Sequence, residues 1–146
     1  MIMKYIKAIF AAFCLLSCVC CSKPDNGGEE PLLEVNRNNI SGEWELVEWN
    51  GNSLEEGTFF RITLVRNDGT FTIVQNMDAF PDIPREITGR YDLREDEVYG
   101  SVISGIYDHD SGFWSHEYSI SNLTAVRMQW VAVDEPGFVQ IFERVN

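Results

Sequence analysis

The chain has 146 residues, of which 23 are acidic and 11 are basic, so its formal net charge at pH 7 is −12. Binding to nucleic acid or adhesion to anionic lipid is not expected, because both need clustered lysine and arginine side chains. All four cysteines lie within the first 21 residues. This excludes a disulfide framework and a cysteine-based zinc site in the rest of the chain, which is long enough for one domain with a single core.

Residues 1–17 have the layout of a signal peptide. Lys4 and Lys7 form a positive start, and an uncharged apolar run follows from Ala8 to Ser17. The run is shorter than the roughly 20 apolar residues that cross a bilayer, so a transmembrane helix is the weaker interpretation. Removal of this segment leaves 9 basic and 23 acidic residues, and the remaining chain is therefore more acidic still.

The end of this segment resembles the lipobox of bacterial lipoproteins. Residues 15–18, Leu-Leu-Ser-Cys, place a leucine three residues before a cysteine and a small residue directly before it. The resemblance implies that the Cys18 thiol carries a diacylglycerol and that the new amino terminus is acylated, with palmitate as the expected chain. Cys21 is the alternative lipidated residue, although Cys20 precedes it. Several acyl chains give a stable anchor, so a lipid-anchored protein of the bacterial outer membrane is expected.

Residues 18–39 are predicted to be the lipidated N-terminus and an acidic, flexible tether. The segment 22–31 has two prolines, two glycines, three acids and no large apolar residue, so it cannot bury enough surface to offset its chain entropy. Acids soon after the lipidated cysteine also resemble the surface-export signal of Bacteroidetes lipoproteins. Both the cell surface and the periplasmic face of the membrane stay open. Residues 35–39 are expected to form a short helix or turn.

From residue 40 to residue 146 apolar residues alternate with period two between turn residues, which predicts an all-β domain. Asn67-Asp68-Gly69 is the strongest hairpin signal. A turn at 94–96 and a polar loop at 105–112 are also expected. The predicted strands are 43–49, 59–66, 70–75, 86–93, 97–104, 113–120, 123–133 and 138–145.

Eight short antiparallel strands predict a small up-and-down barrel that leaves no sheet edge exposed, with a β-sandwich as the main rival. An eight-stranded barrel is either filled by its side chains or holds one small ligand.

Two short motifs at the ends of this domain resemble the lipocalin signature. Gly42-x-Trp44 opens the first strand, and Arg144 lies in the last one. The resemblance implies that Arg144 lies across Trp44 at the closed end of the barrel, in a cation–π contact. Residues 67–71 and 118–124 look like those of the small lipocalin-like lipoproteins of Bacteroidetes. The chain is shorter than full lipocalins and has no room for their flanking helix.

The residues that could support metal binding or catalysis are few. Asp108-His109-Asp110 and His116 are residue types that ligate metals, but their spacing matches no closed motif. A solvated polar loop is therefore favoured, and no metal or cofactor is expected. Carboxylates are numerous, but the sequence gives no pairing distance for a glycosidase pair. Because there is also no nucleophile motif and no glycine-rich phosphate loop, the protein is not expected to be an enzyme.

Aromatic residues outnumber what one small core needs, so some are expected to line the mouth of the barrel or to face outward. The favoured hypothesis is a small apolar or amphipathic ligand at the open end, bound by Trp114, Tyr118 and Trp130. His116 is either a polar group that orients the ligand or a hydrogen-bonded core histidine. The alternative is a monomeric accessory module that binds protein or glycan on its outer surface around a filled interior. An apolar cavity would favour the first, and an exposed aromatic patch the second.

Overall fold

A computed structural model describes residues 28–78, 83–110 and 112–146. The predicted signal peptide and both candidate lipidation residues, Cys18 and Cys21, lie outside these ranges and stay predictions. Within the ranges, no helix has the length and apolar character needed to span a bilayer.

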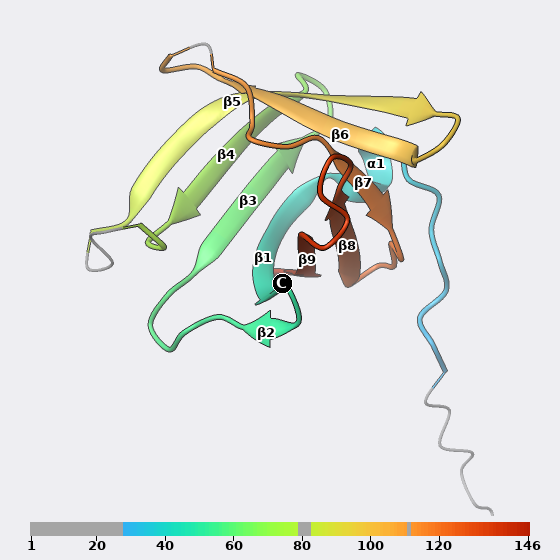
Figure 1. The fold of residues 1–146 in the computed structure, drawn as a ribbon, viewed down its shortest axis with the longest axis horizontal. Helices are drawn as coiled ribbons and strands as arrows, with labels where there is room; N and C mark the ends of the chain where they lie inside the picture. Colours follow the sequence, from blue (N-terminus) through green and yellow to red (C-terminus); the bar gives the residue numbers. More distant parts are fainter. Residues whose placement is uncertain (1–27, 79–82, 111) are drawn as a thin grey trace, which may run out of the picture.

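The described chain is almost entirely β-structure (Figure 1). Each strand pairs antiparallel with its neighbour, and β1 also pairs with β9, which closes the sheet into a barrel. Eight strands form the barrel wall, whereas the two-residue β2 only adds a hairpin to β1. The predicted lipocalin-like barrel is thus confirmed over the β-sandwich. The elements are α1 (Arg37–Ile40), β1 (Gly42–Trp49), β2 (Asn52–Ser53), β3 (Phe60–Val65), β4 (Thr70–Gln75), β5 (Arg85–Asp96), β6 (Gly100–Tyr107), β7 (Tyr118–Ser121), β8 (Arg127–Ala132) and β9 (Val139–Arg144).

The β3–β4 hairpin shows how the period-two pattern sets the fold. Ile62 lies opposite Ile73 and Leu64 opposite Phe71, and all four side chains are buried. The intervening residues face outward, as the alternation of a strand requires. Gly69 closes the turn with a φ of 62° and donates its N–H to the Val65 carbonyl at 3.1 Å. The predicted hairpin at Asn67-Asp68-Gly69 is therefore confirmed.

The β5–β6 hairpin turns later than predicted. β5 continues through 94–96, and β6 continues to Tyr107, inside the expected loop. The Asp96 carboxylate accepts the N–H groups of Val98 and Tyr99 at 2.9 and 3.1 Å, and Gly100 has a φ of 72°. These two local features place the turn at 97–99, so the predicted turn at 94–96 and the start of the loop at 105 are wrong.

The predicted strand 113–120 is only partly a strand, because β7 begins at Tyr118. The preceding segment is held by an isolated bridge between Ile106 and Phe113. The backbone N–H of Trp114 also donates to the Gly105 carbonyl at 2.9 Å. β6 and β7 share two register pairs, Val102 with Ser119 and Ile103 with Tyr118. The seam between these two strands is therefore the shortest in the barrel wall.

The predicted strand 123–133 also starts late, at Arg127. The Thr124 hydroxyl accepts the backbone N–H groups of Val126 and Arg127 at 3.3 and 3.0 Å and forms a turn there. Val126 is consequently exposed instead of sharing the inner face with Met128 and Trp130.

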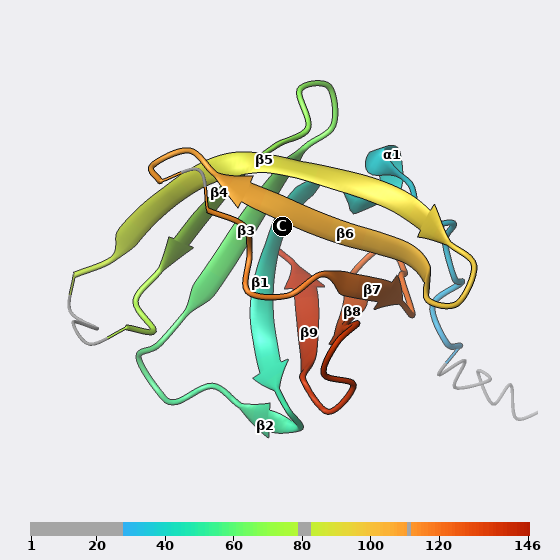
Figure 2. The same ribbon diagram turned by 45° about the horizontal axis from the view of Figure 1, so that its top comes forward.

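α1 covers one end of the barrel, and β2 lies toward the other (Figure 2). Asn36 caps α1 by accepting the Asn39 N–H at 3.0 Å, and Ile40 is fully buried. Leu33 and Val35 pack against the core, and the Leu33 N–H donates to the Leu123 carbonyl at 2.8 Å. Contacts with the barrel thus begin before the predicted domain start at residue 40.

Candidate functional site

Arg144 organises the closed end of the barrel. Its guanidinium carbon lies 4.1 Å from the centre of the Trp44 ring, which is the cation–π contact expected from the sequence. The same group donates to three backbone carbonyls at 2.7 to 2.9 Å, those of Asn39, Ser41 and Ala125. The Trp44 indole donates to the Ile40 carbonyl at 2.8 Å. The contacts tie α1, β1 and β9 into one plug.

Gly42 explains why the opening motif needs a glycine. Its φ is 121°, and a Cβ at this position would lie 2.6 Å from an Arg144 nitrogen. Only glycine leaves room for the guanidinium, so Gly42 and Trp44 each contact Arg144 directly.

The opposite end of the barrel contains a cavity of about 450 Å³. All four residues predicted to bind a ligand, Trp114, His116, Tyr118 and Trp130, line it. The sequence analysis did not assign the other lining residues to this site: Trp49, Phe60, Ile62, Ile73, Gln75, Met77, Asp78, Tyr107, Ser115, Phe138 and Gln140.

Trp114 is positioned by glycine although it lies outside any strand. A Cβ at Gly105 would lie 2.2 Å from the indole, so the ring rests on the bare backbone of β6. The ring centre lies 5.0 Å from that of Phe71 and 5.8 Å from that of Trp130. The indole Nε1 is buried and has no hydrogen-bond partner in the described chain. Packing, not hydrogen bonding of the side chain, therefore holds this ring inside the barrel.

Tyr118 and Trp130 continue this aromatic wall. Their ring centres are 5.3 Å apart, and Trp130 lies 4.8 Å from Phe142 in the core beneath it. Burial raises the pKa of Tyr118 to about 12. Its phenol is therefore neutral at physiological pH and can donate a hydrogen bond as well as accept one.

His116 lines the cavity and is also hydrogen-bonded, and its role toward a ligand stays a prediction. Its Nδ1 lies 2.8 Å from Asp134 Oδ1, and its ring lies 4.8 Å from that of Phe138. The hydrogen bond with His116 lowers the pKa of Asp134. This contact joins the segment before β7 to the loop between β8 and β9.

Gln140 is the polar residue that the sequence analysis missed. The register of β9 places it opposite Trp130 on β8 and Trp49 on β1. It is 7% exposed and lines the cavity, and no hydrogen bond joins its side-chain amide to a residue that the structure describes. A glutamine at an inward position, two residues before the buried Phe142, was the available signal.

The segment 108–110 does not join His116 in a cluster. The Thr88 hydroxyl donates to Asp108 at 2.8 Å, and His109 lies 3.3 Å from Asp110. Over 28–78, 83–110 and 112–146, no group of three His, Cys, Asp or Glu side chains is arranged to hold a metal ion. His116 faces Asp134 instead.

A closed antiparallel barrel with a plugged end and a hollow end is the architecture of a ligand-binding or interaction module. The sequence model of the lipocalin-like domain family matches residues 40–130, which is more than half of the chain. This protein therefore belongs to the lipocalin-like domain family. A comparison with curated proteins finds no match. The last strand, β9, follows the matched range and closes the barrel against β1.

Proposed function

We propose that this protein is a lipid-anchored, monomeric binding protein of the bacterial outer membrane, without catalytic activity, that takes up a small apolar or amphipathic molecule at the open end of its barrel. One observation carries the proposal: the barrel is not filled. Its cavity of about 450 Å³ falls within the range of about 300–1,000 Å³ that is typical of small-molecule sites. The interior thus has the size that the ligand hypothesis needs.

The lining supplies both contacts that an amphipathic ligand needs. Trp114, Tyr118 and Trp130 offer adjoining aromatic faces, which bury an apolar body. Gln140 borders the cavity, and its side-chain amide, which makes no hydrogen bond to the described chain, offers a donor and an acceptor. A ligand with a polar group within reach can therefore hydrogen-bond to this amide.

The anchor in this proposal rests on the lipobox resemblance at Cys18. Leu33 and Val35 pack against the core, and the chain then enters α1 at the closed end, so the segment that would join the anchor meets the barrel at the end opposite the cavity.

The second candidate function is an interaction module, for protein or glycan. Phe113 and Ile106 form a bridge on the outer surface and are 75% and 43% exposed. An exposed aromatic ring of this kind suits stacking on a sugar or a partner side chain. The same pair therefore serves as the control in the test that follows.

Native mass spectrometry of the mature protein, purified from its own host, tests the cavity. A small molecule released on denaturation is expected. Phe138→Ala removes a ring that contacts Trp49 and His116 at the mouth and should reduce retention of this molecule about tenfold, which corresponds to about 1.4 kcal/mol. Phe113→Ala removes an exposed ring from the outer surface, directly before Trp114 in the chain. This control should leave retention of the small molecule unchanged. Loss of glycan or partner binding in Phe113→Ala, together with an empty cavity, would favour the second candidate.

The anchor has its own test. Cys18→Ser should leave the precursor uncleaved and without lipid, as measured by palmitate labelling and by its mass. Cys21→Ser is the matched control and should be processed normally. The opposite pattern would move the lipid to Cys21, and labelling of neither residue would overturn the anchor.

A further inference from the structure

Acidic residues predominate around the mouth of the barrel. Four connections surround the mouth, and each contains or adjoins a residue that lines the cavity: Trp49, Met77, Tyr107 and Phe138. Their described residues, within 50–59, 76–84, 108–116 and 133–138, carry seven aspartates and glutamates and no lysine or arginine. Arg85, which follows the second connection, pairs with Asp78 at 2.8 Å, so the connections around the mouth carry a net negative charge.

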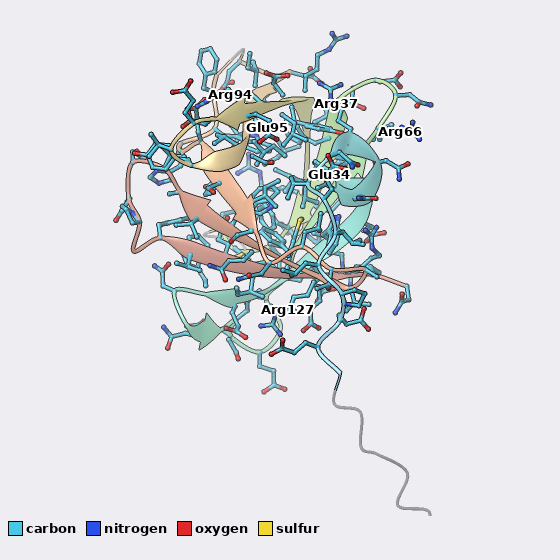
Figure 3. All side chains as sticks on the ribbon, turned by 90° about the vertical axis from the view of Figure 1, so that its right-hand side faces the viewer. Glu34, Arg37, Arg66, Arg94, Glu95 and Arg127 are labelled. Carbon is cyan, nitrogen blue, oxygen red and sulfur yellow. The ribbon has the colours of Figure 1, made fainter. Side chains whose placement is uncertain are left out.

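Several arginines lie at the closed end and are paired or hydrogen-bonded there. Figure 3 faces the side with α1 and labels Arg37, Arg66 and Arg127. Arg37 pairs with Asp92 at 3.4 Å, Arg66 donates to Asn38 at 2.8 Å, and Arg127 pairs with Glu48 at 3.0 Å. No lysine or arginine lines the cavity among the described residues.

The interior adds an independent feature: Gln140, a residue that is 7% exposed, borders the cavity with a side-chain amide that makes no hydrogen bond to the described chain. Around it stand the faces of Trp114, Tyr118 and Trp130, whose ring centres lie 5.3 to 6.3 Å apart. Aromatic faces attract cations because their quadrupole is negative above the ring. The cavity therefore offers an apolar body, one neutral hydrogen-bonding group and an attractive environment for positive charge.

We infer that the cavity selects a cationic amphipathic ligand, a protonated amine on an aromatic or aliphatic body, over a carboxylate of the same shape. The inference rests on the proposed function and specifies the ligand class of the same site. The apolar body lies against the aromatic wall, with Gln140 bonded to a polar group along it. The ammonium stays at the mouth, where it keeps water and meets the carboxylates of Asp134 and Glu135.

A carboxylate of the same shape keeps the apolar contact but loses the attraction at the mouth. Its anionic end would approach acidic side chains at the mouth, and no arginine fork lies inside to receive it. The Tyr118 phenol and the Gln140 amide can donate to it, but neither carries a compensating charge. Burial of an unpaired anion is costly, so the carboxylate is the disfavoured form.

Three probes of matched shape test the inference: 1-naphthylmethylamine, 1-naphthylmethanol and 1-naphthoate. Equilibrium dialysis against the full mature protein in zwitterionic nanodiscs, with empty nanodiscs as the blank, gives each dissociation constant. At 20 mM NaCl we expect the amine to bind at least about threefold tighter than the alcohol, and the alcohol tighter than the carboxylate. At 500 mM NaCl the preference for the amine over the alcohol should shrink, because added salt screens exposed charges.

Two charge-matched double variants locate the effect. Glu55→Gln with Glu135→Gln removes two acids from the mouth and should weaken amine binding about threefold at low salt, without changing alcohol binding. Asp68→Asn with Glu97→Gln removes two acids from turns at the closed end and should change neither. If both double variants weaken amine binding equally, the preference depends on the net charge of the protein alone. That result would overturn the role of the mouth.

The outcomes separate the inference from the function beneath it. If the alcohol binds as tightly as the amine, or the carboxylate does, the preference for a cationic ligand is overturned. The cavity remains a binding site in either case. Failure of all three probes to bind, together with an empty protein from the host, overturns both.

Discussion

The two ends of the barrel use the same strands and differ in how their interior is completed. On β9, Phe142 and Gln140 are two residues apart and both face inward. Phe142 is fully buried in the closed-end core, whereas Gln140 borders a cavity of about 450 Å³. At the closed end Arg144 binds three carbonyls, while at the mouth the equivalent space is left to solvent or ligand. Stability and recognition are thus divided along the barrel axis.

The largest expected difference between the ends is the cost of losing a tryptophan. Trp44→Ala removes a side chain with no exposed surface and the hydrogen bond to Ile40, and should lower the free energy of unfolding by about 4 kcal/mol. Trp114→Ala should cost about 2 kcal/mol, because its ring already borders a cavity and water can fill the space. Urea unfolding followed by circular dichroism measures both. Equal losses would contradict the division between a sealed end and a hollow end.

The next effect concerns Arg144. Arg144→Met keeps much of the side-chain volume but leaves three carbonyls without their charged donor and removes the contact with Trp44, at an expected cost of about 3 kcal/mol. Arg127→Met is the matched control, since Arg127 makes solvent-exposed ion pairs with Glu48 and Glu143 that are typically worth up to about 1 kcal/mol. Thermal unfolding of the two variants side by side decides whether the closed end depends on this one cation.

Alkaline pH should weaken the open end through Tyr118. Burial raises the pKa of Tyr118 from 10.0 to about 12, so the folded protein keeps the phenol protonated when the unfolded chain has already released the proton. This contribution is fully present below pH 10 and is lost as pH rises toward 12. The loss should reach about 2 kcal/mol, and Tyr118→Phe should remove it. Urea midpoints of both proteins between pH 8 and 12 test this, and parallel curves would sink it.

The smallest effect is expected at the exposed pair of His116 and Asp134. The hydrogen bond from His116 lowers the pKa of Asp134 below its ordinary value of 3.8, so its stabilising contribution is present above that pH and is lost as pH falls. Asp134→Asn should therefore lower the melting temperature slightly at pH 7 and lower it less at pH 3. If the variant lowers the melting temperature more at pH 3 than at pH 7, the pH dependence is opposite to the expected one and the prediction is wrong. Scanning calorimetry at the two pH values gives the comparison.

The strands with regular alternation could be predicted from the sequence, and so could the contact between Trp44 and Arg144. Turn positions were harder, because the carboxylate of Asp96, together with Gly100, decides where β5 ends. Trp114 and His116 were expected to face inward on a strand. They do line the cavity, but from an unpaired segment that Gly105 accommodates.

Gln140 was not predicted because a polar residue in a terminal strand reads as solvent-exposed until its neighbours across the barrel are known. Its inward position follows from the register with β1 and β8, which depends on barrel closure. Periodicity within one segment gives the alternation but not the partner that covers each face. The ligand-binding roles of the four predicted residues stay predictions, although the structure gathers them around one cavity.

The pairing of β1 with β9 also sets an order of events during folding. The hydrogen bond from Arg144 to Ser41 spans 103 residues, so the plug cannot assemble before the last strand is available. Contacts of such long range slow the folding of β-proteins, because the chain must close a large loop before the contact forms. Until then the edge of β1 that pairs with β9 stays unpaired, within a chain of net negative charge. A protein exported as proposed here would thus stay unfolded enough to be threaded across a membrane until its final residues have passed, and would acquire its shape only on the far side.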